Sequence, residues 1–288
     1  MGLFGKIFVA FSVKQEASCR RSIIQLSLLI IFTSMLYGGF LWNPIVFDDA
    51  NFFWEDIPLR YGHAPFQFDF RWFPYASLGW TQVYLGSELI YFRLGNLALH
   101  IATSVALFVF LRALFVAVLP QGDAERAKDF ISHDWLAFFG ALIFALHPVA
   151  VYGAGYLIQR SIVMATLFVL LMLIFWMKGL ASGKQRWLYL SAGCYFLAIF
   201  SKEHSIMAPA LIIALTLLLR KPSLELGKRI ALPFVGFVLI ALFVVLKAKG
   251  VIGSPYEPDA ASMLQRMAED PGSMDVADAY TLSVLTQG

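Results

Sequence analysis

The chain has 288 residues, of which 59% are hydrophobic and only 14% are charged, with a formal net charge of +3. A soluble globular domain carries about 25% charged residues, so this composition excludes an ordinary soluble domain and indicates a polytopic membrane protein. No Gly-rich phosphate loop or nucleic-acid motif occurs, and no nucleic-acid partner is expected. The two cysteines, Cys19 and Cys194, have no spacing that suggests a disulfide or a metal pair.

In chain order, about seven segments are apolar and long enough to be considered as spans of a hydrocarbon core of about 30 Å. They must be helices, because unpaired backbone groups are not tolerated in lipid. The predicted fold is therefore an all-α bundle of transmembrane helices. The fifth segment is short and the third contains His147-Pro148, so their edges stay open. The predicted spans are 22–42, 94–118, 135–152, 160–178, 187–201, 204–220 and 230–247.

The distribution of Lys and Arg predicts the orientation. The N-terminal segment 1–21 and the loops near 119–134, 179–186 and 221–229, with the span ends that flank them, hold most of the basic residues. Cytoplasmic loops are enriched in Lys and Arg, so we expect these segments to face the cytoplasm. A bacterial inner membrane is the expected location, with segments 43–93 and 248–288 outside.

Two outer segments differ in character from the spans. Segment 43–93 contains "FQFDFRWFPYASLGW" and "VYLGSELIYF", whose aromatic and polar residues favour short helices in the outer interface. Segment 248–288 is polar and acidic and ends in "YTLSVLTQG", which is typical of the approach to a further span. The expected organisation is thus a cytoplasmic N-terminus, a membrane domain over 22–247 and an outer loop that leads to a span beyond Gly288.

Ionisable residues gather at the outer boundary of the predicted bundle, and charges near membrane depth are functional candidates by default. Each of these residues alone has a simpler interpretation. Arg and Lys at the ends of spans often extend to the lipid headgroups, and an Asp pair often lies in a solvated loop. Together, a cationic set suits a phosphate and a facing carboxylate suits a general base. The carboxylates are Asp48 and Asp49, and the cationic candidates are Arg71, Arg93, Arg160, Lys202 and His204.

Four segments resemble the membrane part of the transmembrane-and-TPR O-mannosyltransferase-like family, within the GT-C glycosyltransferase superfamily. They cover roughly residues 43–215 in the family's order. They read "VFDDANFF", "FRWFPYASLGWTQVYLGSELIYFRLGNLALH", "ALIFALHPVAVYGAGYLIQRSIVMATLFVLLML" and "LAIFSKEHSIMAPALIIAL".

The resemblance implies a GT-C-like membrane domain that transfers a sugar from a polyisoprenyl-phosphate donor to a hydroxyl of a protein or glycan on the outer face. One of Asp48 and Asp49 would act as base, while the other orients a helix end, a cation or a metal. A divalent cation, Mg²⁺ or Mn²⁺, would bind this pair if one is used, because both ions prefer oxygen ligands. Besides the Asp pair, five further residues fall on motif positions of the family: Arg71, His147, Arg160, Lys202 and Glu203.

The chain also departs from the family pattern. Ala150 and Tyr152 replace a second His and a Glu, Ile162 replaces an Asp, and Arg93 stands where a His is common. No TPR repeats occur within the 288 residues. These differences keep two alternatives open: a non-catalytic membrane scaffold and a transporter subunit. Transporters usually place polar groups near the bilayer midplane in repeated halves, a pattern that is not found here.

Overall fold

The computed structural model describes residues 3–46, 49–54, 56–64, 66, 69–119, 133–249 and 251–252. Within these ranges every regular element is helical, which confirms the all-α prediction. Residues Met1–Phe237 form one compact unit and Val238–Gly288 a second, and helix α11 begins in the first and ends in the second.

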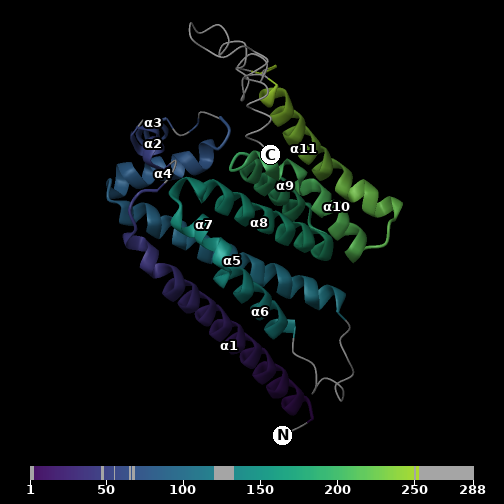
Figure 1. The fold of residues 1–288 in the computed structure, drawn as a ribbon. Helices are drawn as coiled ribbons and strands as arrows, with labels where there is room; N and C mark the ends of the chain where they lie inside the picture. Colours follow the sequence, from purple (N-terminus) through teal and green to yellow (C-terminus); the bar gives the residue numbers. More distant parts are fainter. Residues whose placement is uncertain are drawn as a thin grey trace, which may run out of the picture. The chain divides into compact units, whose positions relative to one another are not determined.

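Figure 1 shows the helices in chain order. The α-helices are α1 (Leu3–Gly38), α2 (Asp49–Trp54), α3 (Ile57–His63), α4 (Trp72–Leu85), α5 (Leu89–Val118), α6 (His133–Leu146), α7 (Val151–Gly155), α8 (Arg160–Ser182), α9 (Gln185–Ile199), α10 (Ala208–Leu219) and α11 (Leu224–Ala248). Short 3₁₀ helices lie between them: η1 (Gly39–Trp42), η3 (Pro148–Ala150), η4 (Leu157–Gln159) and η5 (Glu203–Met207).

Four of the predicted spans are confirmed as helices of sufficient length and apolarity to cross a membrane. These are Arg21–Trp42, Leu89–Val118, Leu157–Ser182 and Leu224–Ala248. The predicted fifth span corresponds to α9, a helix of 15 residues, and the sixth to η5–α10, a shorter apolar helix. The described residues therefore contain four helices long enough to span, or five with the bent pair described next, rather than about seven.

The predicted span 135–152 is a bent pair. Helix α6 and the segment Pro148–Gly155 differ in direction by 54°. The bend lies at His147-Pro148, because proline lacks the amide hydrogen that would continue the helix and forces the preceding residue out of helical geometry. His147 accordingly has extended backbone angles, φ −64° and ψ 132°.

The predicted outer loop contains helices α2, α3 and α4, and their position in a membrane interface stays a prediction. Helices α3 and α4 pack closely where two glycines face each other. A Cβ on Gly62 would lie 2.8 Å from Val83 Cγ2 and 3.0 Å from the Gly79 carbonyl oxygen. A Cβ on Gly79 would collide with the Pro58 carbonyl. Only glycine permits this approach, which places α4, whose N-cap is Arg71, against α3.

Small and aromatic side chains build the core of the bundle. Ala137, Ala141 and Ala145 of α6 are fully buried against α1 and α5, since small residues let membrane helices approach closely. A second cluster joins α2, α4, α5 and η4 through Phe52, Leu78, Phe92 and Leu157. This second cluster brings the outer-loop helices against the beginnings of α5 and α8, where the polar candidates lie.

Candidate catalytic site

The carboxylate of Asp49 is fully buried at the beginning of α2. It accepts hydrogen bonds from the backbone N–H groups of Leu157 and Ile158, each at 2.9 Å. These amides open η4, and the first N–H groups of a helical segment have no partner within it. A carboxylate at such a position is stabilised by the amides and by the helix dipole. Asp49 thus has one of the two roles expected for the Asp pair, which is to orient a helix end.

Arg93 is also buried, with 1% of its surface exposed. Its Nη1 donates to the Gly155 carbonyl and its Nη2 to the Pro44 carbonyl, each at 2.6 Å. Its guanidinium also interacts electrostatically with Asp49. Arg93 therefore joins the entry of the outer loop to the end of α7, and its charge compensates a buried carboxylate.

Arg160, the first residue of α8, is 2% exposed and binds three helices together. Its Nε donates to Asn96 Oδ1 at 2.7 Å and its Nη2 to the Phe92 carbonyl at 2.8 Å. Its Nη1 donates to the hydroxyls of Ser77 at 3.2 Å and Thr81 at 3.4 Å. No salt bridge to this arginine occurs among the described residues, so neutral oxygens of α4 and α5 carry its whole coordination.

Ser77 and Thr81, which accept from Arg160 Nη1, were not among the predicted site residues. Ser77 and Thr81 are four positions apart on α4, a spacing that puts both hydroxyls on one helix face. Gly95 leaves room for the guanidinium, since a Cβ there would lie 2.6 Å from Arg160 Nη2. The i, i+4 hydroxyl pair was a usable signal for a polar face on α4. Its partner was not predictable, because the contact joins residues about 80 positions apart.

A second group, less buried, is formed by Arg71, Lys202 and Glu203. Arg71 donates from Nε to Glu203 Oε2 at 3.1 Å and from Nη2 to Glu203 Oε1 at 2.5 Å. Lys202 Nζ lies 3.8 Å from Glu203 Oε1. Arg71 has φ 62°, a value uncommon for a residue with a side chain, and such conformations cluster at functional sites. This arginine therefore holds the beginning of α4 to the segment between α9 and α10.

The electrostatics of this group favour a bound anion. Burial lowers the pKa of Lys202, and the positive charge of Arg71 lowers it further. Burial tends to raise the pKa of Glu203, but the hydrogen bonds and charge of Arg71 outweigh it, so the pKa of Glu203 is lowered. With Glu203 ionised, two cations face one carboxylate, and the group has an excess positive charge where a phosphate could be held.

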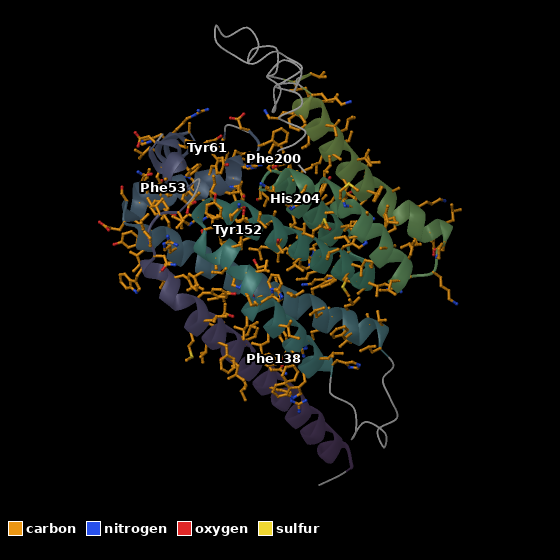
Figure 2. The ribbon with its side chains drawn as sticks, in the orientation of Figure 1. Phe53, Tyr61, Phe138, Tyr152, Phe200 and His204 are labelled. Atoms are coloured by element: carbon orange, nitrogen blue, oxygen red, sulfur yellow. The ribbon has the colours of Figure 1, made fainter. Side chains whose placement is uncertain are left out.

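The two candidate histidines are exposed and lie on different segments. His147 Nδ1 accepts from the Val149 N–H at 3.2 Å, and its carbonyl accepts from the Tyr37 hydroxyl at 2.9 Å. His204 belongs to η5, and Figure 2 labels it together with Tyr152 of α7. Tyr152 is 52% exposed and its hydroxyl accepts from Gln159 Nε2 at 2.9 Å, although sequence reasoning treated it only as a departure.

The structure brings the predicted residues together in two groups. Asp49, Arg93 and Arg160 form a buried group around the beginning of α8, and Arg71, Lys202 and Glu203 form a partly exposed group. No hydrogen bond or salt bridge among the described residues joins either histidine to these groups. Asp48 lies outside the described residues.

The metal prediction can be tested only against the part of the chain that the structure describes. No group of three or more His, Cys, Asp or Glu side chains suited to a metal ion occurs there. Both Asp49 oxygens already accept backbone hydrogen bonds. Asp48, the other predicted ligand, lies outside the described residues, so the divalent-cation site stays a prediction and no step of the proposed reaction uses it.

Comparison with protein-family models, with curated proteins and with solved structures gave no match for this chain.

Proposed function

We propose that the chain is a GT-C-type glycosyltransferase that moves a sugar from a polyisoprenyl phosphate to an acceptor hydroxyl on the outer face of the membrane. The observation that carries the proposal is a set of three long-range contacts among the four segments that resemble the family. Asp49 binds the amides before α8, Arg160 binds α4 and α5, and Arg71 binds Glu203. Segments far apart in sequence thus supply both polar groups.

The proposed roles divide by burial. Arg71, Lys202 and His204 are the more accessible basic residues and would hold the donor phosphate, with Glu203 setting the direction of Arg71. The buried Asp49, Arg93 and Arg160 would act as positioning residues, because each is bonded to the protein's own groups, although Arg93 Nε has no hydrogen-bond partner among the described residues. Asp48 is then the remaining carboxylate for the base, and His147 stays a candidate for sugar contact.

The reaction would proceed by direct displacement. The acceptor oxygen attacks the anomeric carbon, Asp48 takes the hydroxyl proton, and the bond from that carbon to the phosphate oxygen breaks. The polyisoprenyl phosphate leaves with the electron pair of that bond. Negative charge accumulates on this leaving group, so nearby cations lower the barrier more effectively than a nucleophile on the protein would.

The decisive test compares Asp48→Asn with Asp56→Asn. Transfer from a labelled polyisoprenyl-phosphate hexose is measured in purified protein, together with donor binding and thermal unfolding. A general base contributes about 10²–10⁴-fold to a rate. Asp48→Asn should therefore reduce transfer by that factor with unchanged donor binding and unfolding temperature. Asp56 is an exposed carboxylate of the same loop with φ 52°, a conformation that Asn accepts, so it is the matched control.

A non-catalytic scaffold is the second candidate, because one observation favours it. Asp49, Arg93 and Arg160 are bonded within the chain, and Ala150 and Tyr152 stand where the resembled family has His and Glu. If the chain is a non-catalytic scaffold, Asp48→Asn should leave the activity of the complex that contains it at the wild-type level. Wild-type transfer by that variant would overturn the catalytic proposal.

A further inference from the structure

A basic cavity lies at the ends of α8 and α10 remote from the candidate site. Its volume is about 740 Å³, and it is bounded by the α8–α9 turn and the beginning of α11. Arg220, Lys221 and Arg229 line it, with Glu225 as the acidic member, which leaves an excess of two positive charges. By the Lys and Arg distribution this is the predicted cytoplasmic end of the bundle.

Two of these arginines are held in place by the protein. Arg220 Nη2 donates to the Leu180 carbonyl at 3.0 Å, and Arg229 Nη2 donates to the Gly179 carbonyl. Arg229 Nε is buried and has no hydrogen-bond partner within the described residues. Each guanidinium is thus anchored by one nitrogen at the last turn of α8. An anchored guanidinium loses less side-chain freedom when it binds a phosphate.

An apolar cavity of about 200 Å³ adjoins the basic one between α8, α10 and α11. The two share Arg220, Ser223 and Leu226. Trp176 and Ile212 form part of the apolar wall. Leu217, also on this wall, is 61% exposed, so the cavity is reached from the outer surface of the helices. An apolar slot therefore continues directly from a cationic pocket at one end of the bundle.

The beginning of α11 adds a further positive contribution. Ser223 Oγ accepts from the Leu226 N–H at 3.2 Å and so caps this helix of 25 residues. The positive end of a helix dipole favours anions, and here it coincides with the cationic cavity.

We propose that these two cavities form a binding site for an anionic phospholipid. The headgroup phosphate lies between Arg220 and Arg229, and part of one acyl chain occupies the apolar cavity. Clustered Lys and Arg beside a transmembrane helix recognise anionic lipids. A chain that leaves the bilayer for an apolar cavity gains packing contacts rather than hydrophobic transfer free energy, so the cavity adds affinity and the headgroup supplies the selectivity. A soluble phosphate or an acidic peptide could bind the cationic cavity but would leave the adjoining apolar cavity unfilled.

The test is a native mass-spectrometry titration of the full chain in detergent with phosphatidylglycerol and phosphatidylcholine of matched chains. Each Lys or Arg near an anionic headgroup contributes a free energy equivalent to several-fold in affinity. Arg220→Gln with Arg229→Gln should therefore weaken phosphatidylglycerol binding by roughly 10- to 30-fold and leave phosphatidylcholine unchanged. Lys178→Gln with Arg186→Gln is the matched control, since both cations flank Trp187 outside the cavity.

A second pair of variants tests the acyl chain without a charge change. Gly227 lines the apolar cavity, and a Cβ there meets no atom within 4 Å, so Gly227→Leu adds apolar volume at the cavity wall with no collision at its Cβ. It should weaken phosphatidylglycerol binding, whereas Gly193→Leu, equally open on α9, should not. Three outcomes would overturn the proposal. Gly227→Leu could bind phosphatidylglycerol as wild type does, or the Arg220/Arg229 and Lys178/Arg186 double variants could lose the same affinity. Wild-type protein could also bind glycerol 3-phosphate as tightly as phosphatidylglycerol.

Discussion

Arg71 and Glu203 are 132 positions apart in the chain, yet two guanidinium nitrogens of the first donate to both carboxylate oxygens of the second. This bidentate pair joins the outer-loop helix α4 to the segment between α9 and α10. It also leaves Lys202 beside the same carboxylate. The pair is therefore a structural link and, in the proposed function, the group that sets the position of a phosphate-binding arginine.

The first prediction concerns the stability of this link as the pH changes. Because the folded-state pKa of Glu203 is lowered, ionised Glu203 stabilises the fold above its unfolded pKa of about 4.3. That contribution is lost as the pH falls through the lower folded pKa. Glu203→Gln should lower the unfolding temperature at pH 7, by an amount equivalent to about 0.5–1 kcal/mol for a partly exposed pair. The difference from wild type should shrink toward zero in acid.

Thermal unfolding in detergent between pH 3 and pH 8 measures this effect. Glu88→Gln is the control, because Glu88 is exposed and forms no salt bridge within the described residues. A difference between Glu203→Gln and wild type that stays constant across this range would contradict the prediction.

The second prediction separates stability from function at Lys202. Its lowered pKa means that folding disfavours the charged form, so the charge reduces stability at neutral pH. Wild-type stability should rise as the pH increases from the folded pKa toward about 10.4, the unfolded value. Lys202→Gln should keep or raise the unfolding temperature at pH 7 while it weakens donor binding. Lower stability with unchanged donor binding would show instead that Lys202 serves only its contact with Glu203.

The third prediction tests the space that Gly95 leaves for Arg160. Gly95→Ala places a Cβ 2.6 Å from the Arg160 guanidinium, which is held by hydrogen bonds to α4 and α5. Overpacking of this kind costs about 1–3 kcal/mol, and it should appear as a lower unfolding temperature. Gly193→Ala meets no atom within 4 Å and should be neutral or slightly stabilising, since Ala favours helix. In an Arg160→Met background the penalty of Gly95→Ala should largely disappear, and persistence of the full penalty would exclude this contact as its cause.

The fourth prediction distinguishes the two aspartates. Asp49→Asn replaces one of the two accepting oxygens with an NH2 group that faces a backbone N–H, and it leaves Arg93 without its compensating charge. Loss of one partner from a buried ionic contact costs about 3–5 kcal/mol. This variant should therefore lose transfer together with thermal stability, whereas Asp48→Asn should lose transfer alone. Unfolding curves of both purified variants provide the measurement, and an unaltered curve for Asp49→Asn would refute the positioning role.

The sequence grouped four cations that the structure places in two different surroundings. Arg93 and Arg160 were grouped with Arg71 and Lys202 as phosphate-binding cations. In the structure the first two are buried and bonded to backbone and side-chain oxygens, whereas the others are partly exposed. A one-dimensional pattern shows that an arginine lies near a helix end. It does not show whether that end faces a neighbouring helix or an opening.

The same limit applies to the spans. Apolar length identified Arg21–Trp42, Leu89–Val118, Leu157–Ser182 and Leu224–Ala248, because hydrophobic composition is a local property that the lipid phase selects directly. The predicted spans 187–201 and 204–220 correspond to the shorter helices α9, of 15 residues, and α10, of 12 residues. Their apolar residues also suit packing against neighbouring helices.

Composition and local pattern by themselves determined that this chain is a helical membrane protein and that its ionisable residues lie near the ends of several helices. Both follow from the cost of unpaired backbone groups and charges in lipid. The tertiary structure alone decided that Asp49 binds the amides of Leu157 and Ile158, and that Arg160 crosses α5 at Gly95. Those contacts join residues tens of positions apart, and their partners are selected by the three-dimensional packing of the helices rather than by any local preference of the chain.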